Sequence, residues 1–171
     1  MKLFTTFLLT CSVILAGVFD FETISSDFKQ TITNEENSSI VYEGSFYAST
    51  QAKALWIYKS PIDKKIYFNK NRVVIIEPEL EQVIITNLQS APNLTEILKS
   101  SKKVDNKTYE AVYNDIKYTI QVDNKLLDTI SYSDKLGNIV EIKLYNQSIN
   151  TFLDDALFQA VIPKDFDVVT Q

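Results

Sequence analysis

The feature that most restricts the fold of this chain is a succession of short runs rich in Val, Ile, Tyr and Phe, separated by Asn, Asp, Lys, Ser and Pro. Such runs are typical of antiparallel strands joined by short turns. About ten of them in succession, with few helical segments, indicate a mainly β protein whose sheet curls into a barrel or half-barrel. We expect strands at Ile24–Thr33, Ser39–Ala48, Ala54–Lys59, Lys64–Asn69, Arg72–Glu77, Glu81–Thr86, Tyr109–Tyr113, Lys117–Val122, Leu126–Ser133, Ile139–Tyr145 and Ala160–Ile162.

Two segments have features of short helices. Pro92–Lys99 places Leu94, Ile97 and Leu98 on one face, as expected for a helix packed on a core. Asp154–Phe158 begins with two aspartates, which suit the start of a helix as a cap and as partners of its dipole.

The segment Asp20–Ile32 fits two secondary structures. Phe21, Ile24, Phe28 and Ile32 follow a helical stripe, whereas alternate residues from Ile24 to Ile32 fit one face of a strand equally well. Hydrophobic periodicity therefore leaves helix and strand open at this point.

The N-terminus has the pattern of an export signal. A positive start is followed by an apolar run over Leu3–Ala16, which is too short for a comfortable membrane span. Small residues at Ala16 and Gly17 mark the expected cleavage region, so the mature chain would begin near Val18. We therefore expect a signal peptide at residues 1–17. Residues 18–171 contain no internal repeat or linker and are expected to form one domain.

Composition restricts the chemistry of the mature protein. The net charge of −5 for the full chain and the scattered lysines argue against nucleic-acid binding. The chain has no histidine, which removes the usual general base, the usual activator of a nucleophile and the commonest metal ligand, and its one cysteine, Cys11, lies in the signal. Glu77, Glu79 and Glu81 are interpreted as a solvated loop. We expect no catalytic residues, metal site or cofactor, and hence no enzyme.

Large apolar side chains are unusually abundant for a small β protein. Both an ordinary core and the wall of an apolar ligand cavity inside a barrel would account for them, and composition leaves both open. The set is Phe46, Trp56, Tyr58, Ile66, Phe68, Ile75, Leu94, Ile97 and Leu98.

Three stretches, taken in order, resemble one family. Phe28–Ile32 is similar to an F-x-Q strand, Tyr42–Tyr47 followed by Ala54–Pro61 resembles E-G-x-G and then W-x-Y-x-x-P, and Ile76–Val83 is close to Y-x-P-x-x-x-Q-V. The separations between these motifs fit without gaps. Together they resemble the LolA family, the periplasmic carriers of lipoproteins in Gram-negative bacteria.

The resemblance implies an incomplete, half-open antiparallel β-barrel with one or two short helices as a lid over a cavity for acyl chains. It makes Ile24–Thr33 the first strand, places Trp56, Ile32 and Ile66 in the cavity wall, and makes Pro92–Lys99 part of the lid. The candidate lipid-binding residues of the cavity and lid are Ile24, Phe28, Ile32, Phe46, Trp56, Tyr58, Ile66, Phe68, Leu94, Ile97 and Leu98.

The resemblance also implies partners: acylated lipoproteins as cargo, an inner-membrane ABC-type exporter that loads the carrier, and an outer-membrane acceptor that unloads it. We expect a monomer that is soluble in the periplasm. The chain departs from the family at the arginine that helps to close the lid. Thr50, Gln51 and Leu55 stand at the matching positions, and Lys53 is the nearest cation. A lysine lacks the planar fork of arginine, so that closing contact does not carry over.

Other functions remain open from the sequence. A LolB-like outer-membrane lipoprotein receptor would need a lipidated N-terminal cysteine, and Cys11 lacks the small residue expected before it. A lipid- or glycan-modifying hydrolase would need two carboxylates facing each other across a cleft. A non-carrier envelope protein that binds lipid, or one with a purely structural role, is the remaining alternative.

Overall fold

The computed structural model describes Phe19 and residues 21–87 and 94–170. The predicted signal peptide at residues 1–17 lies outside the described residues. All strands of the described part belong to one sheet. They are β1 Thr23–Thr33, β2 Ser39–Ser49, β3 Lys53–Ser60, β4 Lys64–Asn69, β5 Arg72–Glu77, β6 Gln82–Asn87, β7 Lys102–Lys103, β8 Thr108–Tyr113, β9 Ile116–Asp123, β10 Leu126–Ser133, β11 Ile139–Ile149 and β12 Asp167–Thr170. The helices are α1 Leu94–Ser100 and the 3-10 turns η1 Pro78–Leu80 and η3 Asp155–Phe158.

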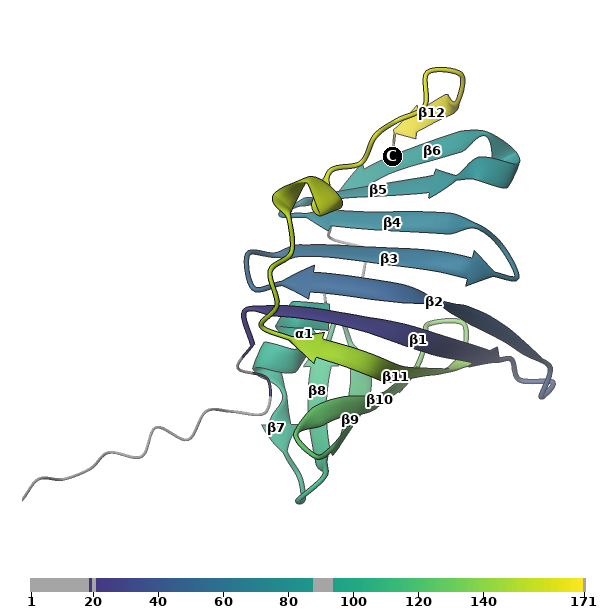
Figure 1. The fold of residues 1–171 in the computed structure, drawn as a ribbon. Coiled ribbons are helices and arrows are strands. Elements are labelled where there is room, and N and C mark those ends of the chain that lie inside the picture. The colour runs from purple at the N-terminus through teal and green to yellow at the C-terminus, as the bar shows by residue number, and fades with distance from the viewer. Residues whose placement is uncertain (1–18, 20, 88–93, 171) are drawn as a thin grey trace, which may run out of the picture.

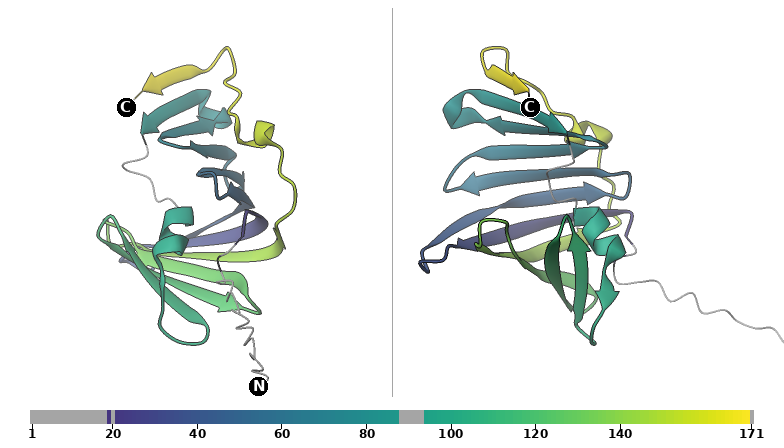
Figure 2. Two further views of the ribbon diagram at one scale, coloured as in Figure 1. Left: turned by 90° about the vertical axis from the view of Figure 1, so that its left-hand side faces the viewer. Right: turned by 180° about the vertical axis from the view of Figure 1, so that it is seen from behind.

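The sheet runs in the order β12-β6-β5-β4-β3-β2-β1-β11-β10-β9-β8-β7. All neighbouring strands are antiparallel except β12, which pairs with β6 in parallel. In the described part of the chain β12 and β7 are the two edges and do not pair with each other, so the sheet stays open. Figures 1 and 2 show it strongly curved, with α1 on the concave side and the segment leading to β12 on the convex side. The expected half-open barrel with few helices is confirmed.

Alternation along each strand divides the apolar side chains between the two faces of the sheet. The main core fills the concave side and includes Ile24, Phe28 and Phe46, together with Ile97 and Leu98 of α1. A smaller cluster of buried residues lies on the convex side, where Val74, Ile76 and Val83 pack against Tyr67, Ile85, Ala160 and Phe166. The molecule therefore has two cores that share one sheet.

The C-terminal segment forms a strap over the convex side, which we define as residues 150–166. η3 packs on β3 and β4, and the Phe158 ring is buried there. Lys53 Nζ of β3 lies 2.7 Å from Asp155 Oδ1. The backbone N–H of Ala156 donates to Asp154 Oδ1 over 2.9 Å, which confirms that this aspartate pair begins a short helix.

Most predicted strands are confirmed, with differences at the two ends of the chain. The ambiguous N-terminal segment is the strand β1 from Thr23. The strand predicted at Ala160–Ile162 is wrong. Those residues belong to the strap, where Ala160 packs on the convex cluster, and the edge of β6 pairs with Asp167–Thr170 instead. The two-residue strand β7 was not predicted. α1 begins at Leu94, and residues 92 and 93 lie outside the described part.

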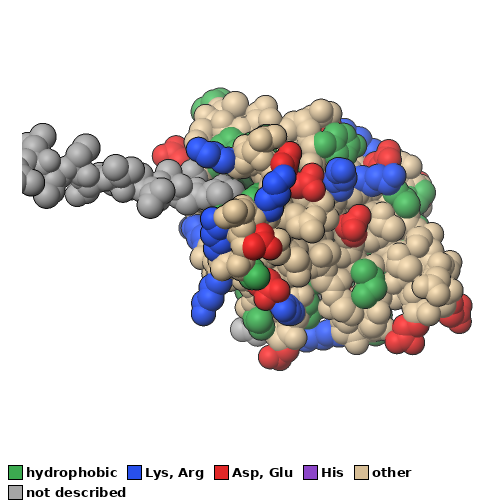
Figure 3. Space-filling model, turned by 90° about the horizontal axis from the view of Figure 1, so that it is seen from below, with side chains coloured by type: hydrophobic (Ala, Val, Ile, Leu, Met, Phe, Trp, Pro, Cys, Tyr) green, Lys and Arg blue, Asp and Glu red, His purple; other side chains and the backbone are tan. Residues whose placement is uncertain are grey.

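Seen from below, Lys/Arg and Asp/Glu side chains are interspersed over the surface and the hydrophobic ones are scattered (Figure 3). Among the described residues, no helix is long and apolar enough to cross a bilayer.

Candidate functional site

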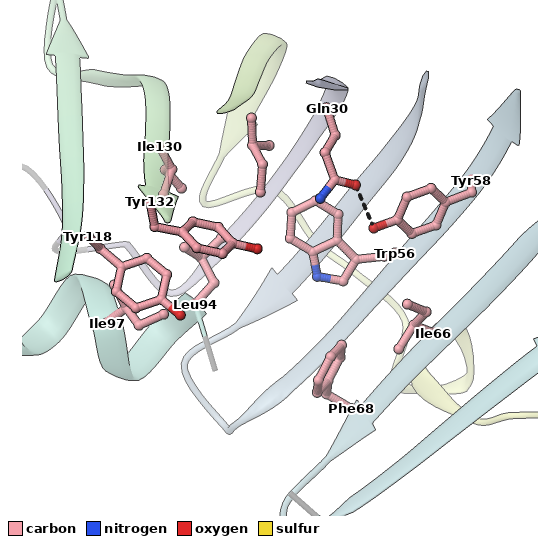
Figure 4. Close-up of a pocket in the computed structure, with 11 residues that line it drawn as sticks. Gln30, Trp56, Tyr58, Ile66, Phe68, Leu94, Ile97, Tyr118, Ile130 and Tyr132 are labelled. Atoms are coloured by element: carbon pink, nitrogen blue, oxygen red, sulfur yellow. Dashed lines mark hydrogen bonds between the residues drawn. The ribbon is translucent and has the colours of Figure 1, made fainter. Parts of the chain in front are cut away.

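The concave side holds a cavity of about 150 Å³ between α1 and the sheet. Figure 4 shows aromatic side chains from β3, β9 and β10 facing one another across it. The cavity is lined by Gln30, Trp56, Tyr58, Ile66, Phe68, Leu94, Ile97, Tyr118, Ile130, Tyr132 and Ile142.

Cross-strand register brings these side chains together. Trp56 of β3 lies opposite Ile66 of β4, and Phe68 follows two residues later on the same face. Gln30 of β1 lies opposite Ile142 of β11, which in turn lies opposite Ile130 of β10. Because residues two apart point to the same face, the alternation of each strand places all of them on the concave side.

The Trp56 indole is held by aromatic neighbours. Its ring centroid lies 4.4 Å from that of Phe46 and 4.9 Å from that of Phe28, the latter at an interplanar angle of 72°. Edge-to-face pairs of this kind are favourable beyond the apolar area that they bury. Trp56 remains half-buried because its other side faces the cavity.

α1 closes one side of the cavity. Its Leu94 is half-buried and lines the cavity, whereas Ile97 lines it and is also buried in the main core. The helix packs on β8. Burial raises the pKa of Tyr113 on β8, and the carboxylate and hydrogen bond of Glu96 on α1 raise it further. The helix is thus held by apolar burial and by a polar contact with β8.

Polar groups are few within the cavity. The Tyr58 hydroxyl donates to Gln30 Oε1 over 3.0 Å. The buried Tyr118 hydroxyl has no hydrogen-bond partner among the described residues. Burial raises the pKa of Tyr58, and burial, with smaller contributions from Tyr118 and Asp134, raises the pKa of Tyr132 to about 12. These phenols therefore stay neutral at physiological pH.

The wall carries no charge. Apart from its tyrosines, none of the described lining residues is ionisable. The lining residues themselves offer no counter-ion to a charged ligand group, which would be desolvated there at a cost. The arrangement suits a largely hydrocarbon ligand.

The structure places six of the eleven candidate residues around the cavity, namely Trp56, Tyr58, Ile66, Phe68, Leu94 and Ile97. The other five lie in or against the main core, outside the cavity lining: Ile24, Phe28, Ile32, Phe46 and Leu98.

Five lining residues were not among the candidates: Gln30, Tyr118, Ile130, Tyr132 and Ile142. Gln30 could have been found, because it lies two residues after Phe28 in the strand and therefore on the same face. The others belong to β9, β10 and β11, which form the far wall. Nothing in their local sequence distinguishes a lining residue from a core residue.

Lys53, the cation nearest to the family's arginine position, does not face the cavity. It lies two residues before Leu55 in β3, so both side chains are on the convex face, and it pairs with Asp155 of the strap. Its side chain is only 15% exposed. The lysine therefore contacts the strap on the convex face and contributes nothing to the cavity lining.

Comparison with known proteins agrees with the motifs. A sequence model of the family described as "Outer membrane lipoprotein carrier protein LolA" matches residues 20–110. The outer-membrane lipoprotein carrier protein of Campylobacter jejuni subsp. jejuni is 39% identical, over 98% of both chains. The protein of that name from Helicobacter hepaticus is 33% identical, over 93% of this chain and 89% of its own. The one from Wolinella succinogenes is 34% identical, over 92% of each.

Solved structures share the fold at low sequence identity. An uncharacterised conserved protein from Thermus thermophilus superposes with a TM-score of 0.54 at 12% identity, covering 92% of each chain. A LolA-superfamily protein from Nitrosomonas europaea superposes with a TM-score of 0.50 at 8% identity, covering 81% of this chain and 90% of its own. At these identities the likeness concerns the fold alone.

Proposed function

The chain belongs to the LolA family of outer-membrane lipoprotein carrier proteins, and from this we propose that it carries lipoproteins through the periplasm with their acyl chains in the cavity beside Trp56. The observation that carries the proposal is the uncharged, largely aromatic and aliphatic wall between α1 and the concave face of the sheet. Such a wall removes hydrocarbon from water, which is the physical requirement of an acyl-chain carrier.

The size of the cavity indicates how cargo is held. Ligand pockets for small molecules usually measure about 300–1,000 Å³, whereas this cavity measures about 150 Å³. A complete acyl chain therefore needs the cavity to widen or leaves part of the chain exposed. Full burial of a long chain would contribute on the order of 10 kcal/mol at roughly 0.8 kcal/mol per CH₂. Partial burial keeps the cargo transferable.

α1 is the element that can widen the cavity, and we assign it to the lid. It is short, and it contributes Leu94 and Ile97 to the wall without belonging to the sheet. Its closed position rests on burial of Ile97 and Leu98 and on the contact between Glu96 and Tyr113. This lid needs no arginine.

The transport route follows from the family. We propose that residues 1–17 direct export and are removed, and that residues 18–171 form a single carrier domain, monomeric and soluble in the periplasm. An inner-membrane ABC-type exporter would load it, and an outer-membrane acceptor would unload it. In this role the chain binds and releases cargo without chemical change and without a cofactor.

The deciding experiment measures release of a triacylated lipoprotein from inner-membrane vesicles into solution by the purified mature protein. Trp56→Asp places a carboxylate in the cavity wall and should abolish release. Ile57→Asp is the matched control, because it puts the same charge on a half-buried position of the same strand but on the convex face. It should retain release.

Circular dichroism and thermal unfolding establish that both variants are folded. A folded Trp56→Asp protein that releases lipoprotein as well as the wild type would contradict the assignment of the cavity. An equal loss of lipoprotein release in both variants would mean that a charge anywhere in β3 disturbs the sheet, and would contradict a specific role of the cavity.

A further inference from the structure

An unused hydrogen-bond donor lies inside the cavity. The Tyr118 side chain is 1% exposed, it lines the cavity, and its hydroxyl has no partner among the described residues. A buried donor without an acceptor is unfavourable, and native structures rarely retain one unless a ligand or ion completes it.

A second hydroxyl lies beside it. The ring centroids of Tyr118 and Tyr132 are 4.8 Å apart, on directly opposed residues of β9 and β10. Figure 4 shows both hydroxyls directed away from their strands, toward the side where α1 and Trp56 lie. The two rings thus present neighbouring donors to one part of an otherwise apolar wall.

The chemistry of these donors narrows what they can recognise. A hydrocarbon tail offers no acceptor and would leave the Tyr118 hydroxyl unsatisfied. A free carboxylate would accept, but the described lining contains no cation to compensate its charge. The carbonyl oxygen of an ester or amide is a neutral acceptor, and every acyl chain linked to a lipid headgroup carries one at its polar end.

We propose that Tyr118, with Tyr132 beside it, binds the carbonyl of an ester- or amide-linked acyl chain and so sets how far the chain enters the cavity. This inference rests on the proposed carrier function and adds a polar subsite to it. The carbonyl end lies against β9 and β10, and the hydrocarbon extends past Trp56 toward Ile66 and Phe68. Burial raises the pKa of both tyrosines, so both remain donors at neutral pH.

The test uses the fluorescence of Trp56 to report lipid binding, because Trp56 is the one tryptophan of the chain and it lines the cavity. Tryptophan fluorescence is titrated with dioctanoylglycerol, which has ester carbonyls, and with dioctylglycerol, its ether analogue without them. The wild type should bind the ester roughly threefold to tenfold more tightly, the increment of one neutral hydrogen bond. Tyr118→Phe should remove most of this preference while leaving affinity for the ether unchanged.

Tyr67→Phe is the matched control, since Tyr67 lies on the convex face outside the cavity. It should retain the preference for the ester. Removal of an unpartnered hydroxyl should not lower the unfolding temperature of Tyr118→Phe.

Three results would overturn the inference. Equal affinity of the wild type for ester and ether would remove the carbonyl subsite while leaving the apolar cavity intact. A full ester preference in Tyr118→Phe would exclude this residue as the donor. Absence of any fluorescence response to both lipids would overturn the cavity assignment itself, and the subsite with it.

Discussion

Gly44 shows at the level of one residue how close packing within the sheet requires a glycine. It lies in β2 opposite Phe28 on one side and Tyr58 on the other. A Cβ atom here would overlap the backbone carbonyl of Ile57 and come within 2.9 Å of the Phe28 ring. The absence of a side chain thus lets the Phe28 ring cross β2 and meet Trp56 and Tyr58.

Gly44→Ala should therefore destabilise the protein by at least about 2 kcal/mol, because the carbonyl that it meets is backbone and cannot rotate away. Chemical denaturation followed by circular dichroism measures the change in the free energy of unfolding. Ser39→Ala, an exposed position of the same strand, serves as the control and should change it little. A Gly44→Ala variant as stable as the wild type would show that β2 can shift to accommodate a methyl group.

Asp27 is the hub of a polar network on the convex face. Its carboxylate accepts from Asn146 Nδ2 and from the Ser45 hydroxyl, each over 3.0 Å, and Ser45 in turn accepts from Lys59 Nζ over 2.7 Å. The hydrogen bonds from Asn146 and Ser45, with the charge of Lys59, lower the pKa of Asp27 below its ordinary value of 3.8. The folded state therefore favours the ionised carboxylate.

A lowered pKa in the folded state contributes stability that is present above the unfolded pKa and is lost as the pH falls through the folded pKa. The wild type should thus lose stability on acidification below about pH 4. Asp27→Asn should weaken this dependence, because the amide does not titrate. Denaturation curves between pH 6 and pH 3, roughly the range over which carboxylates titrate, would reveal it. An unchanged slope in the variant would mean that other carboxylates determine it.

We expect α1 to have two separable roles, support of the fold and contact with cargo. Leu98 is buried in the main core and does not line the cavity, whereas Leu94 is half-buried and does. One helix thus carries an anchoring leucine and a cavity leucine, four residues apart.

Leu98→Ala should lower the free energy of unfolding by about 2–5 kcal/mol through the cavity that it leaves. Leu94→Ala should cost less stability but weaken the binding of dioctanoylglycerol roughly tenfold, because apolar contact with the ligand is lost. Thermal unfolding and Trp56 fluorescence measured on both variants separate the two effects. The assignment of Leu94 would fail if its variant bound lipid normally while Leu98→Ala did not.

At the scale of the whole molecule, the open sheet needs support on both faces. The concave face is filled by the main core and by α1, and the convex face of β3–β6 is covered by the strap through Phe158 and Phe166. The strap leads into β12, which covers the outer edge of β6. An uncovered edge strand offers unpaired backbone groups to other chains, and β12 satisfies those of β6.

The strap is expected to stabilise the fold without contacting cargo. Phe158→Ala should lower the free energy of unfolding by about 3–5 kcal/mol, because a buried aromatic ring is removed. Lipid affinity per folded molecule should stay at the wild-type value. Lys53→Ala should cost no more than about 1 kcal/mol, since Asp155 is largely exposed. A folded Phe158→Ala variant that cannot bind lipid would show that the two faces are coupled.

Local patterning was sufficient for most of the strands, and the ordered motifs were sufficient for the family. Lys64–Asn69, Arg72–Glu77 and Leu126–Ser133 were predicted with the bounds that the structure has, because β-branched and aromatic runs between turn residues are a short-range signal. It was insufficient at β12, whose pairing with β6 spans more than eighty residues of sequence. The apolar run at Ala160–Ile162 therefore looked like the better strand.

The membership of the cavity depended on long-range geometry. Alternation assigns Trp56, Ile66 and Phe68 to one face, and it assigns Ile24, Phe28 and Phe46 to the same face without saying which of them reaches free space. The curvature of the sheet and the position of α1 decide which of these residues line the cavity and which are buried in the core. They also bring Tyr118 and Tyr132, which are distant in sequence from Trp56, to the far wall of the cavity. Strand formation is encoded over a few residues, whereas an enclosed volume exists only after separate elements have packed around it.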